Sequence, residues 1–136
     1  MPDWTGVHHL NFSVLDLKKS AAWYSEVLGL TRLWELEDTG QGAKVLFLHP
    51  GNRLMIGLTA HASNPGDRFS EFRTGLDHAS FSVSTLQELE AWKAHFEKLG
   101  VEHSPISQTP RGAWELVFRD PDHIQLELFV FTPPGT

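Results

Sequence analysis

Two histidines and one glutamate have the types and spacing expected of metal ligands. His9 and His78 lie at equivalent positions of two similar segments, and Glu127 lies in a third segment with an alternating pattern. The sequence contains no cysteine, so disulfides and thiolate catalysis are excluded and any metal must be held by nitrogen and oxygen. Two histidines and one carboxylate with open coordination positions bind iron(II), and they also accept manganese or zinc. These residues therefore predict a divalent metal site.

An internal repeat relates the two histidines. Residues 6–14, Gly-Val-His-His-Leu-Asn-Phe-Ser-Val, align with residues 75–83, Gly-Leu-Asp-His-Ala-Ser-Phe-Ser-Val. Further along, Leu-Gly-apolar triplets recur at 28–30 and 99–101, and residues 54–59 match 124–129. We expect two modules, about 5–61 and 75–131, joined by a polar stretch. Because either module alone would expose most of its apolar face, we expect one domain over residues 1–136.

Each module is expected to have the order βαβββ. The first strands are predicted at 7–14 and 77–83 from their alternating pattern. The first helix is expected to start at the N-cap Asp16 and to end at Gly29. A capping box of Ser84 and Gln87 is expected to start the second helix, which ends at Gly100. Further strands are expected at 44–49, 53–60, 113–119 and 123–131, with others between them.

The three candidate ligands all belong to polar strand faces. Side chains alternate between the two faces of a strand, so the apolar residues of each strand should pack under the helices and the ligands should lie opposite. A solvated sheet face is the simpler explanation for polar residues. However, the neighbouring residues are short and neutral, which suits the surroundings of a metal site or a substrate pocket. His9 is accompanied by Asn11 and Ser13, His78 by Ser80 and Ser82, and Glu127 by Gln125.

At these residues the sequence resembles the vicinal-oxygen-chelate superfamily. This superfamily includes glyoxalase I, bleomycin-resistance proteins, fosfomycin-resistance enzymes, methylmalonyl-CoA epimerase and extradiol dioxygenases. The likeness covers nearly the whole chain, and its most specific parts are residues 9–17, 23–24, 27–30, 75–78 and 118–127. It implies an α+β fold in which paired βαβββ modules form a cup-shaped, mostly antiparallel sheet with helices on its outer face.

The resemblance also implies metal ligands on the first and last strands of each module. Position by position, these are His9, Gly57, His78 and Glu127. Gly57 departs from the pattern, because glycine has no side chain that binds metal. This departure disfavours a glyoxalase- or epimerase-type lyase or isomerase. His123, where many members have glycine, is a second departure and is expected to alter only a turn.

The implied activity is that of a divalent-metal-dependent enzyme with a dioxygenase-type His/His/Glu site. It would act on a small oxygen-rich molecule, with Fe2+ as the first choice of ion and Mn2+, Zn2+ or Ni2+ as alternatives. His61 and His49 are candidate acid/base residues, although loop histidines are more often simply solvated. Arg73 and Arg111 are candidates for holding an anionic group, although such arginines more often lie on the surface or in ion pairs.

The main alternative is a metal-free protein that binds a small molecule or an antibiotic, as bleomycin-resistance proteins do. Aromatic residues would then line its cleft, although such rings more often pack in a core. A relative with a vestigial site is a further alternative. The candidate rings are Trp4, Trp34, Phe69, Phe72 and Trp114.

The amino-acid composition argues against some classes of binding partner. The chain has 11 basic and 17 acidic residues, a net charge of −6, which argues against nucleic acid or an anionic membrane as a partner. No apolar segment is long enough to cross a bilayer. Residues 1–6 show no signal-peptide pattern, so a cytoplasmic location is expected. A homodimer is expected by analogy with the family.

Overall fold

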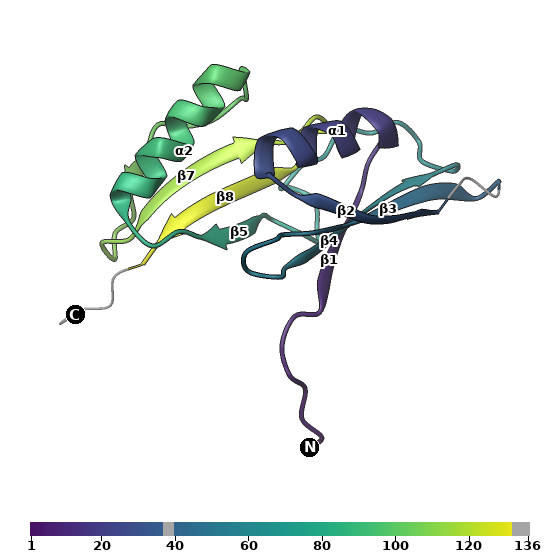
Figure 1. Ribbon diagram of the computed structural model, residues 1–136, viewed down its shortest axis with the longest axis horizontal. Helices are drawn as coiled ribbons and strands as arrows, with labels where there is room; N and C mark the ends of the chain where they lie inside the picture. Colours follow the sequence, from purple (N-terminus) through teal and green to yellow (C-terminus); the bar gives the residue numbers. More distant parts are fainter. Residues whose placement is uncertain (37–39, 132–136) are drawn as a thin grey trace. The chain divides into compact units, whose positions relative to one another are not determined.

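The structure is a computed structural model and describes residues 1–36 and 40–131 (Figure 1). The chain divides between Asp67 and Arg68 into two units. Each unit has the order βαβββ, which confirms the predicted α+β fold. The prediction that the two modules form one domain is not tested by the internal structure of either unit.

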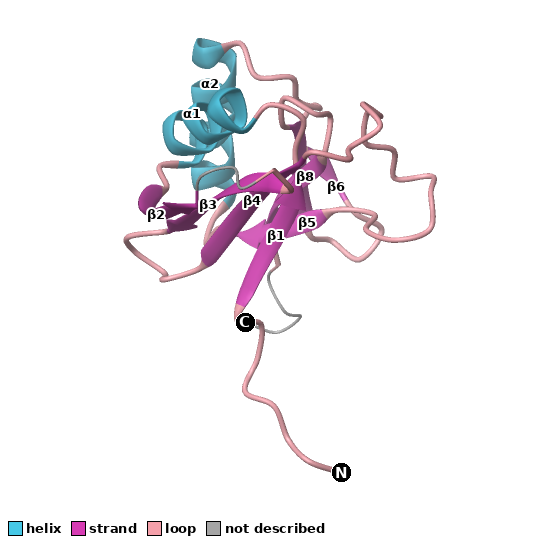
Figure 2. Ribbon diagram, turned by 90° about the vertical axis from the view of Figure 1, so that its right-hand side faces the viewer, coloured by secondary structure: helices cyan, strands magenta, loops and turns pink. Residues whose placement is uncertain are grey.

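In the first unit, helix α1 packs on one face of a four-stranded sheet. The strands lie in the order β1-β4-β3-β2, with β1 parallel to β4 and the other neighbours antiparallel. Figure 2 shows α1 on one side of the strands of its own unit, and it contacts β3 and β4. The elements are β1 (His9–Ser13), α1 (Leu17–Leu28), β2 (Thr31–Leu36), β3 (Gly42–Leu48) and β4 (Met55–His61).

The second unit repeats this topology. Its sheet has the order β5-β8-β7-β6, again with one parallel pair, β5 with β8, and antiparallel neighbours elsewhere. Helix α2 contacts β7 and β8. The elements are β5 (Ala79–Ser82), α2 (Leu86–Leu99), β6 (Ser107–Gln108), β7 (Trp114–Arg119) and β8 (Gln125–Val130).

The core of each unit lies between its helix and its sheet. In the first unit Phe12 stacks on the fully buried Tyr24, with ring centroids 6.1 Å apart. In the second unit Phe96 packs on Phe118 at 4.6 Å, and both rings are fully buried. The apolar positions predicted to face the helices thus do so, which leaves the polar positions of β1, β5 and β8 on the opposite sheet faces.

The helix ends follow the sequence with one correction. Asp16 accepts a hydrogen bond from the amide of Lys19, and Gly29 and Gly100 adopt the left-handed conformation at the two C-caps. The predicted capping box of Ser84 and Gln87 is wrong by one residue. Thr85 is the N-cap and Glu88 its partner, because the Thr85 hydroxyl accepts from the Glu88 amide while the Glu88 carboxylate accepts from the Thr85 amide.

Strand ends and edge strands differ from the sequence pattern in detail. The first strands are shorter than predicted, since β1 begins at His9 and β5 at Ala79. The edge strand β2 exposes all six of its residues, including Trp34, which is 50% exposed. Because no buried face alternates with an exposed one, the pattern of apolar residues gives no signal for this strand. In the described part of the chain, neither helix is both long and apolar enough to span a membrane.

The corrected cap predicts a difference between neighbouring hydroxyl residues. Thr85→Ala is expected to lower the free energy of unfolding by about 1 kcal/mol, because it removes the oxygen that accepts from Glu88. Ser84→Ala is the matched control and is expected to cost less than about 0.5 kcal/mol, since only the Ser84 amide takes part, donating to the Glu88 carboxylate. Urea denaturation of the three proteins measures both values. Equal losses in the two variants would contradict the assignment of Thr85 as the cap.

Candidate metal centre

In the first unit, His9 opens β1 on the face opposite α1. Its ring is exposed and meets the ring of His8 edge-on, with centroids 5.2 Å apart and the two Nδ1 atoms 2.9 Å apart. One of these nitrogens must donate and the other accept. The contact engages Nδ1 of His9, so Nε2 is the nitrogen that His9 offers to a ligand.

Two residues beyond His9, Asn11 lies over Gly57. The two residues are opposite each other in the parallel pairing of β1 with β4. The Oδ1 atom of Asn11 accepts a hydrogen bond of 2.9 Å from the hydroxyl of Thr59, which is only 5% exposed. This face therefore offers the imidazole of His9 and a held amide, with no side chain at position 57.

In the second unit, His78 and Glu127 approach each other across the β5–β8 pair. His78 Nε2 lies 3.9 Å from Glu127 Oε1. Two donors that share one ion at about 2.1 Å are about 3.0–3.4 Å apart in octahedral or tetrahedral geometry, so a small rotation of either side chain brings the pair into range. Nitrogen from histidine and oxygen from glutamate suit iron(II), manganese or zinc. The two residues therefore fit a divalent ion.

Glu127 is an unusual residue for the interior of a sheet. It is only 8% exposed, and its Oε1 accepts a 2.7 Å hydrogen bond from the hydroxyl of Ser80, opposite it in the register. In the described residues its basic neighbour is the ring of His78, at 3.9 Å, rather than a lysine or arginine. Burying a carboxylate costs free energy unless a charge or several hydrogen bonds compensate. A bound cation would supply that compensation.

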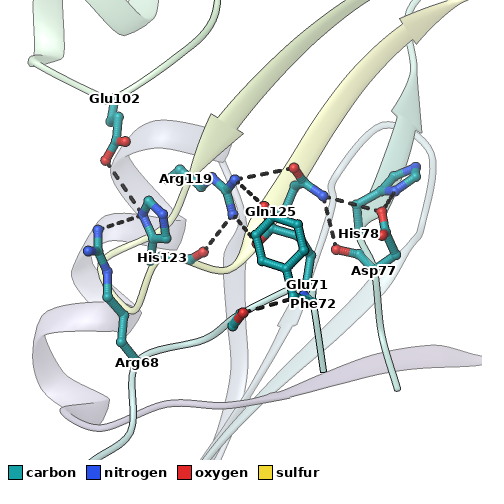
Figure 3. Close-up of polar contacts among 10 residues, drawn as sticks. Arg68, Glu71, Phe72, Asp77, His78, Glu102, Arg119, His123 and Gln125 are labelled. Carbon is teal, nitrogen blue, oxygen red and sulfur yellow. Dashed lines mark hydrogen bonds and ion pairs between the residues drawn. The ribbon is translucent and has the colours of Figure 1, made fainter. Parts of the chain in front are cut away.

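The other nitrogen of His78 is held by Asp77. Nδ1 donates to Asp77 Oδ2 at 2.7 Å (Figure 3). Because an ionised carboxylate can only accept, a hydrogen lies on Nδ1, and in the neutral imidazole the lone pair is then on Nε2, which faces Glu127. A carboxylate behind a ligating histidine fixes its orientation and raises its basicity.

A chain of hydrogen bonds extends from Asp77 to the edge of the unit. The Gln125 amide group donates to the backbone oxygen of Asp77 at 3.1 Å and to its Oδ2 at 3.3 Å. In turn, Gln125 Oε1 accepts from Arg119 Nη2 at 3.2 Å. Arg119 binds both oxygens of Glu71, at 2.8 and 3.1 Å, and the backbone oxygen of His123. Figure 3 shows Arg119, Gln125 and the pair Asp77 and His78 side by side, with Glu71 near Arg119 and Gln125.

The Arg119–Glu71 pair also carries the largest electrostatic effect at the site. The hydrogen bonds from Arg119 lower the pKa of Glu71 from its ordinary value of 4.5 to about 2. The same hydrogen bonds raise the pKa of Arg119. Bidentate pairing of this kind is geometrically specific. It secures the segment that precedes β5, which is also attached through the Phe69 amide to the backbone oxygen of Asp122.

His61 and His49 do not join His9. Met55 is opposite His9, and His61 ends the same strand six residues later (61 − 55), so roughly 20 Å of strand separates their levels. The ring of His49 holds a turn instead, because its Nδ1 accepts from the amides of Gly51 and Asn52, both at 3.1 Å.

The remaining candidates are mostly at the surface. Arg73 and Arg111 are exposed. Of the five aromatic candidates, Phe69 and Trp114 are half-buried, whereas Trp4, Trp34 and Phe72 are exposed, so core packing is wrong for these three. His123 has a φ of 66°, a conformation that favours glycine, in the turn before β8. The ring of His123 also contacts Arg68 Nη2 at 2.7 Å and Glu102 Oε2 at 3.7 Å, so the residue does more than form a turn.

The residues that the sequence did not single out are Asp77, Arg119 and Glu71. Asp77 is adjacent to His78, so the signal for it was a carboxylate next to a candidate ligand. Arg119 and Glu71 are 48 positions apart, and pairing them requires the β7–β8 register and the path of the preceding segment. The spacing of residues in the sequence indicates neither this register nor this path.

The three predicted ligands do not all belong to one unit. His9 belongs to the first unit, and His78 with Glu127 belongs to the second. Among the residues described, no group of three histidine, aspartate or glutamate side chains is arranged to hold an ion. The ligand set His9, His78 and Glu127 stays a prediction, and the second unit contributes a pair that fits.

Comparison with solved structures places this geometry among related folds. The crystal structure of a glyoxylase/bleomycin resistance protein/dioxygenase domain from Frankia sp. EAN1pec is 34% identical, with a TM-score of 0.86, and the match covers 96% of this chain and 100% of that one. A fosfomycin resistance protein, FosX, from Listeria monocytogenes, complexed with Mn(II) and sulfate, is 22% identical with a TM-score of 0.72 and covers 96% of each chain. The second likeness shows the fold alone.

Comparison with known sequences also finds related proteins. The uncharacterised protein YwkD of Bacillus subtilis strain 168 is 31% identical over 124 residues, which cover 90% of this chain and 94% of that protein. A family model described as the Glyoxalase/Bleomycin resistance protein/Dioxygenase superfamily matches residues 6–128. This range covers most of both units and includes His9, His78 and Glu127, and the chain therefore belongs to the Glyoxalase/Bleomycin resistance protein/Dioxygenase superfamily.

Proposed function

We propose that the protein is a divalent-metal-dependent enzyme that acts on a small oxygen-rich molecule. His9, His78 and Glu127 are the proposed ligands, in a dioxygenase-type two-histidine, one-carboxylate set. The observation that carries the proposal is the approach of His78 Nε2 to the buried carboxylate of Glu127, with the other nitrogen of His78 held by Asp77. A pair arranged in this way has the orientation and the unpaired charge that a cation requires.

Neighbouring residues orient the proposed ligands. Ser80 holds one oxygen of Glu127, which orients the carboxylate across the β5–β8 pair. Asp77 keeps the hydrogen of His78 on Nδ1. When bound, a divalent ion supplies a Lewis acid for two neighbouring oxygens of the substrate and, in the case of iron(II), a site for dioxygen. Since position 57 has no side chain, the protein itself provides three ligands.

Fe2+ is the proposed ion, with Mn2+, Zn2+ and Ni2+ as alternatives that the same ligands accept. The Mn(II) complex of FosX supports manganese as one of them. We further propose a cytoplasmic homodimer, as the resemblance implies. The metal-free binding protein is the second candidate, and the exposed rings of Trp4, Trp34 and Phe72 favour it.

Metal content tests the proposal directly. We expect anaerobically purified protein to carry about one divalent ion per chain by elemental analysis, and the His9→Ala, His78→Ala and Glu127→Gln variants to lose it. His61→Ala is the matched control and should retain the ion, because His61 lies far along β4 from the level of His9. A wild-type protein that is free of metal and does not bind added divalent ions would leave the metal-free binding protein as the better explanation.

Asp77 gives a second prediction. Asp77→Ala should weaken Mn2+ binding about 10- to 100-fold, because the ring of His78 loses the acceptor that fixes its hydrogen and orientation. Asp77→Asn keeps an acceptor oxygen and should weaken binding less. Isothermal titration of the two variants measures the difference. Glu90→Ala removes an exposed carboxylate on α2 and serves as the control; if it weakened binding as much as Asp77→Ala, general loss of negative charge would explain the effect instead.

Glu71 predicts a pH dependence of stability. Its pKa is about 2 in the folded protein and 4.5 ordinarily, so its pairing with Arg119 stabilises the fold above pH 4.5 and this contribution disappears as the pH falls toward 2. Glu71→Gln should therefore be less stable than the wild type at pH 7, and the difference should shrink below pH 4.5. Urea denaturation from pH 7 to 3 measures it. A difference that is constant over this range would show that the charge of Glu71 is not the stabilising feature.

A further inference from the structure

Gln125 lies between a positive and a negative group in the second unit. It begins β8 and is opposite Arg119 in the β7–β8 register, so both side chains lie on the same sheet face. Its amide also reaches Asp77, which lies just before β5 (Figure 3). Because this unit begins at Arg68, the whole arrangement belongs to one unit.

The two neighbours of Gln125 allow its amide only one orientation. The guanidinium of Arg119 can only donate, so it faces Gln125 Oε1, at 3.2 Å. The backbone oxygen and the carboxylate of Asp77 can only accept, so they face Gln125 Nε2, at 3.1 and 3.3 Å. An amide turned by 180° would place its NH2 group against the guanidinium and its oxygen against the carboxylate. Both contacts would be repulsive, so the charges on its two sides determine how Gln125 points.

Arg119 is the fixed end of this chain of hydrogen bonds. Its side chain is 16% exposed, and that of its partner Glu71 is 18% exposed. Both Nη atoms of Arg119 donate to Glu71, and Nη1 also donates to the backbone oxygen of His123. Bidentate pairing restricts a guanidinium to one geometry. The group that donates to Gln125 is therefore held in place from within the unit.

Asp77 has much less support of its own. Its side chain is 68% exposed, and its 2.7 Å contact with His78 Nδ1 joins adjacent residues at the surface. Water competes for exposed contacts of this kind, which contribute little by themselves. Gln125 adds two hydrogen bonds, and one of them ends on Oδ2, the oxygen that also accepts from His78. These bonds restrain the carboxylate in the position that faces the ring.

We propose that Gln125 is a positioning residue for His78, and that its amide passes the fixed geometry of Arg119 on to the carboxylate of Asp77. The inference rests on the proposed function, in which His78 is a ligand. With the carboxylate held, the hydrogen of the neutral His78 ring stays on Nδ1, and Nε2 stays free on the side of Glu127. Without Gln125, water competes for the carboxylate, and the ring of His78 exchanges between its two tautomers.

The NMR spectrum of the metal-free protein tests this step directly. At about pH 8.5, where an imidazole is ordinarily neutral, long-range 1H–15N correlations show which ring nitrogen of His78 carries the hydrogen. The signals of this ring are assigned by their loss in His78→Ala. The wild type should have the hydrogen mainly on Nδ1, whereas Gln125→Met, which removes the polar atoms, should give a mixture of tautomers. Gln87→Met changes an exposed glutamine of α2 and is the matched control, which should behave as the wild type does.

A second variant distinguishes positioning from a general loss of structure. Gln125→Glu keeps an acceptor for Arg119, and this charge-assisted pairing should keep its thermal midpoint within about 3 °C of the wild type. The new carboxylate cannot donate to Asp77 and repels it, so the mixture of tautomers should appear in this stable protein as well. If Gln125 had only a structural role, the hydrogen of His78 would remain on Nδ1 in this variant.

Mn2+ binding tests the effect at the proposed ligand. Gln125→Met should weaken Mn2+ binding about fivefold or more, but less than Asp77→Ala does, because it acts through Asp77. In the Asp77→Ala background the same change should weaken binding by less than about twofold, since the route to His78 is already interrupted. Isothermal titration of the wild type, the two single variants and the double variant measures this cycle. Effects that simply multiply would overturn the route through Asp77.

The two kinds of measurement separate this inference from the proposed function. If the wild type binds no Mn2+, the proposed function is overturned, and the tautomer of His78 in the two Gln125 variants still decides whether Gln125 positions the ring. If the wild type binds Mn2+ and both variants keep the hydrogen on Nδ1, the role of Gln125 is overturned and the proposed metal site is retained.

Discussion

The parallel pairing of the first and last strand in each unit is the constraint on which both the cores and the candidate site depend. It joins β1 to β4 and β5 to β8, so residues 47 or 48 positions apart, such as Ser80 with Glu127 and Asn11 with Thr59, come within hydrogen-bonding distance. A parallel pair cannot be closed by a tight turn and needs a long connection. The helix and two strands between the partners form that connection, and the helix covers one face of the sheet.

Strand alternation then determines both sides of each sheet at once. Side chains alternate along a strand, so when one residue packs under the helix its two neighbours point to the opposite face. One strand register therefore fixes both the apolar core and the polar residues on the other face. The antiparallel turns keep this register in place. In the first unit His49 accepts two amide hydrogen bonds in the β3–β4 turn, and in the second Asp120 accepts from the amides of Asp122 and Ile124 in the β7–β8 turn. Different side chains thus perform the same task.

The fold was largely predictable because its signals are local or repeated. The alternating strands, the N-cap at Asp16 and the glycine C-caps follow from short-range patterns, and the repeat relates one unit to the other. The capping box was placed one residue early because serine and threonine are both good caps. The structure distinguishes them, since the backbone of Thr85 is extended and its hydroxyl accepts from the Glu88 amide. The edge strand β2 was missed in detail because it buries no face that periodicity can reveal.

The candidate site was predictable only as residue types. The sequence indicates His9, His78 and Glu127, but not the support of His78 by Asp77, Gln125, Arg119 and Glu71, which depends on contacts across strands and on the path of the segment before β5.

The difference between the two units follows from the cost of burying charge. Glu127 is almost completely buried with a serine hydroxyl and one histidine beside it, an arrangement that is costly unless a cation is present. A carboxylate at position 57 would be a buried charge within the first unit and would need compensation of its own there. Asn11 avoids the cost, because its amide is neutral and its acceptor is paired with Thr59. The second unit therefore carries a buried carboxylate on its polar sheet face, and the first carries a neutral amide at the corresponding place.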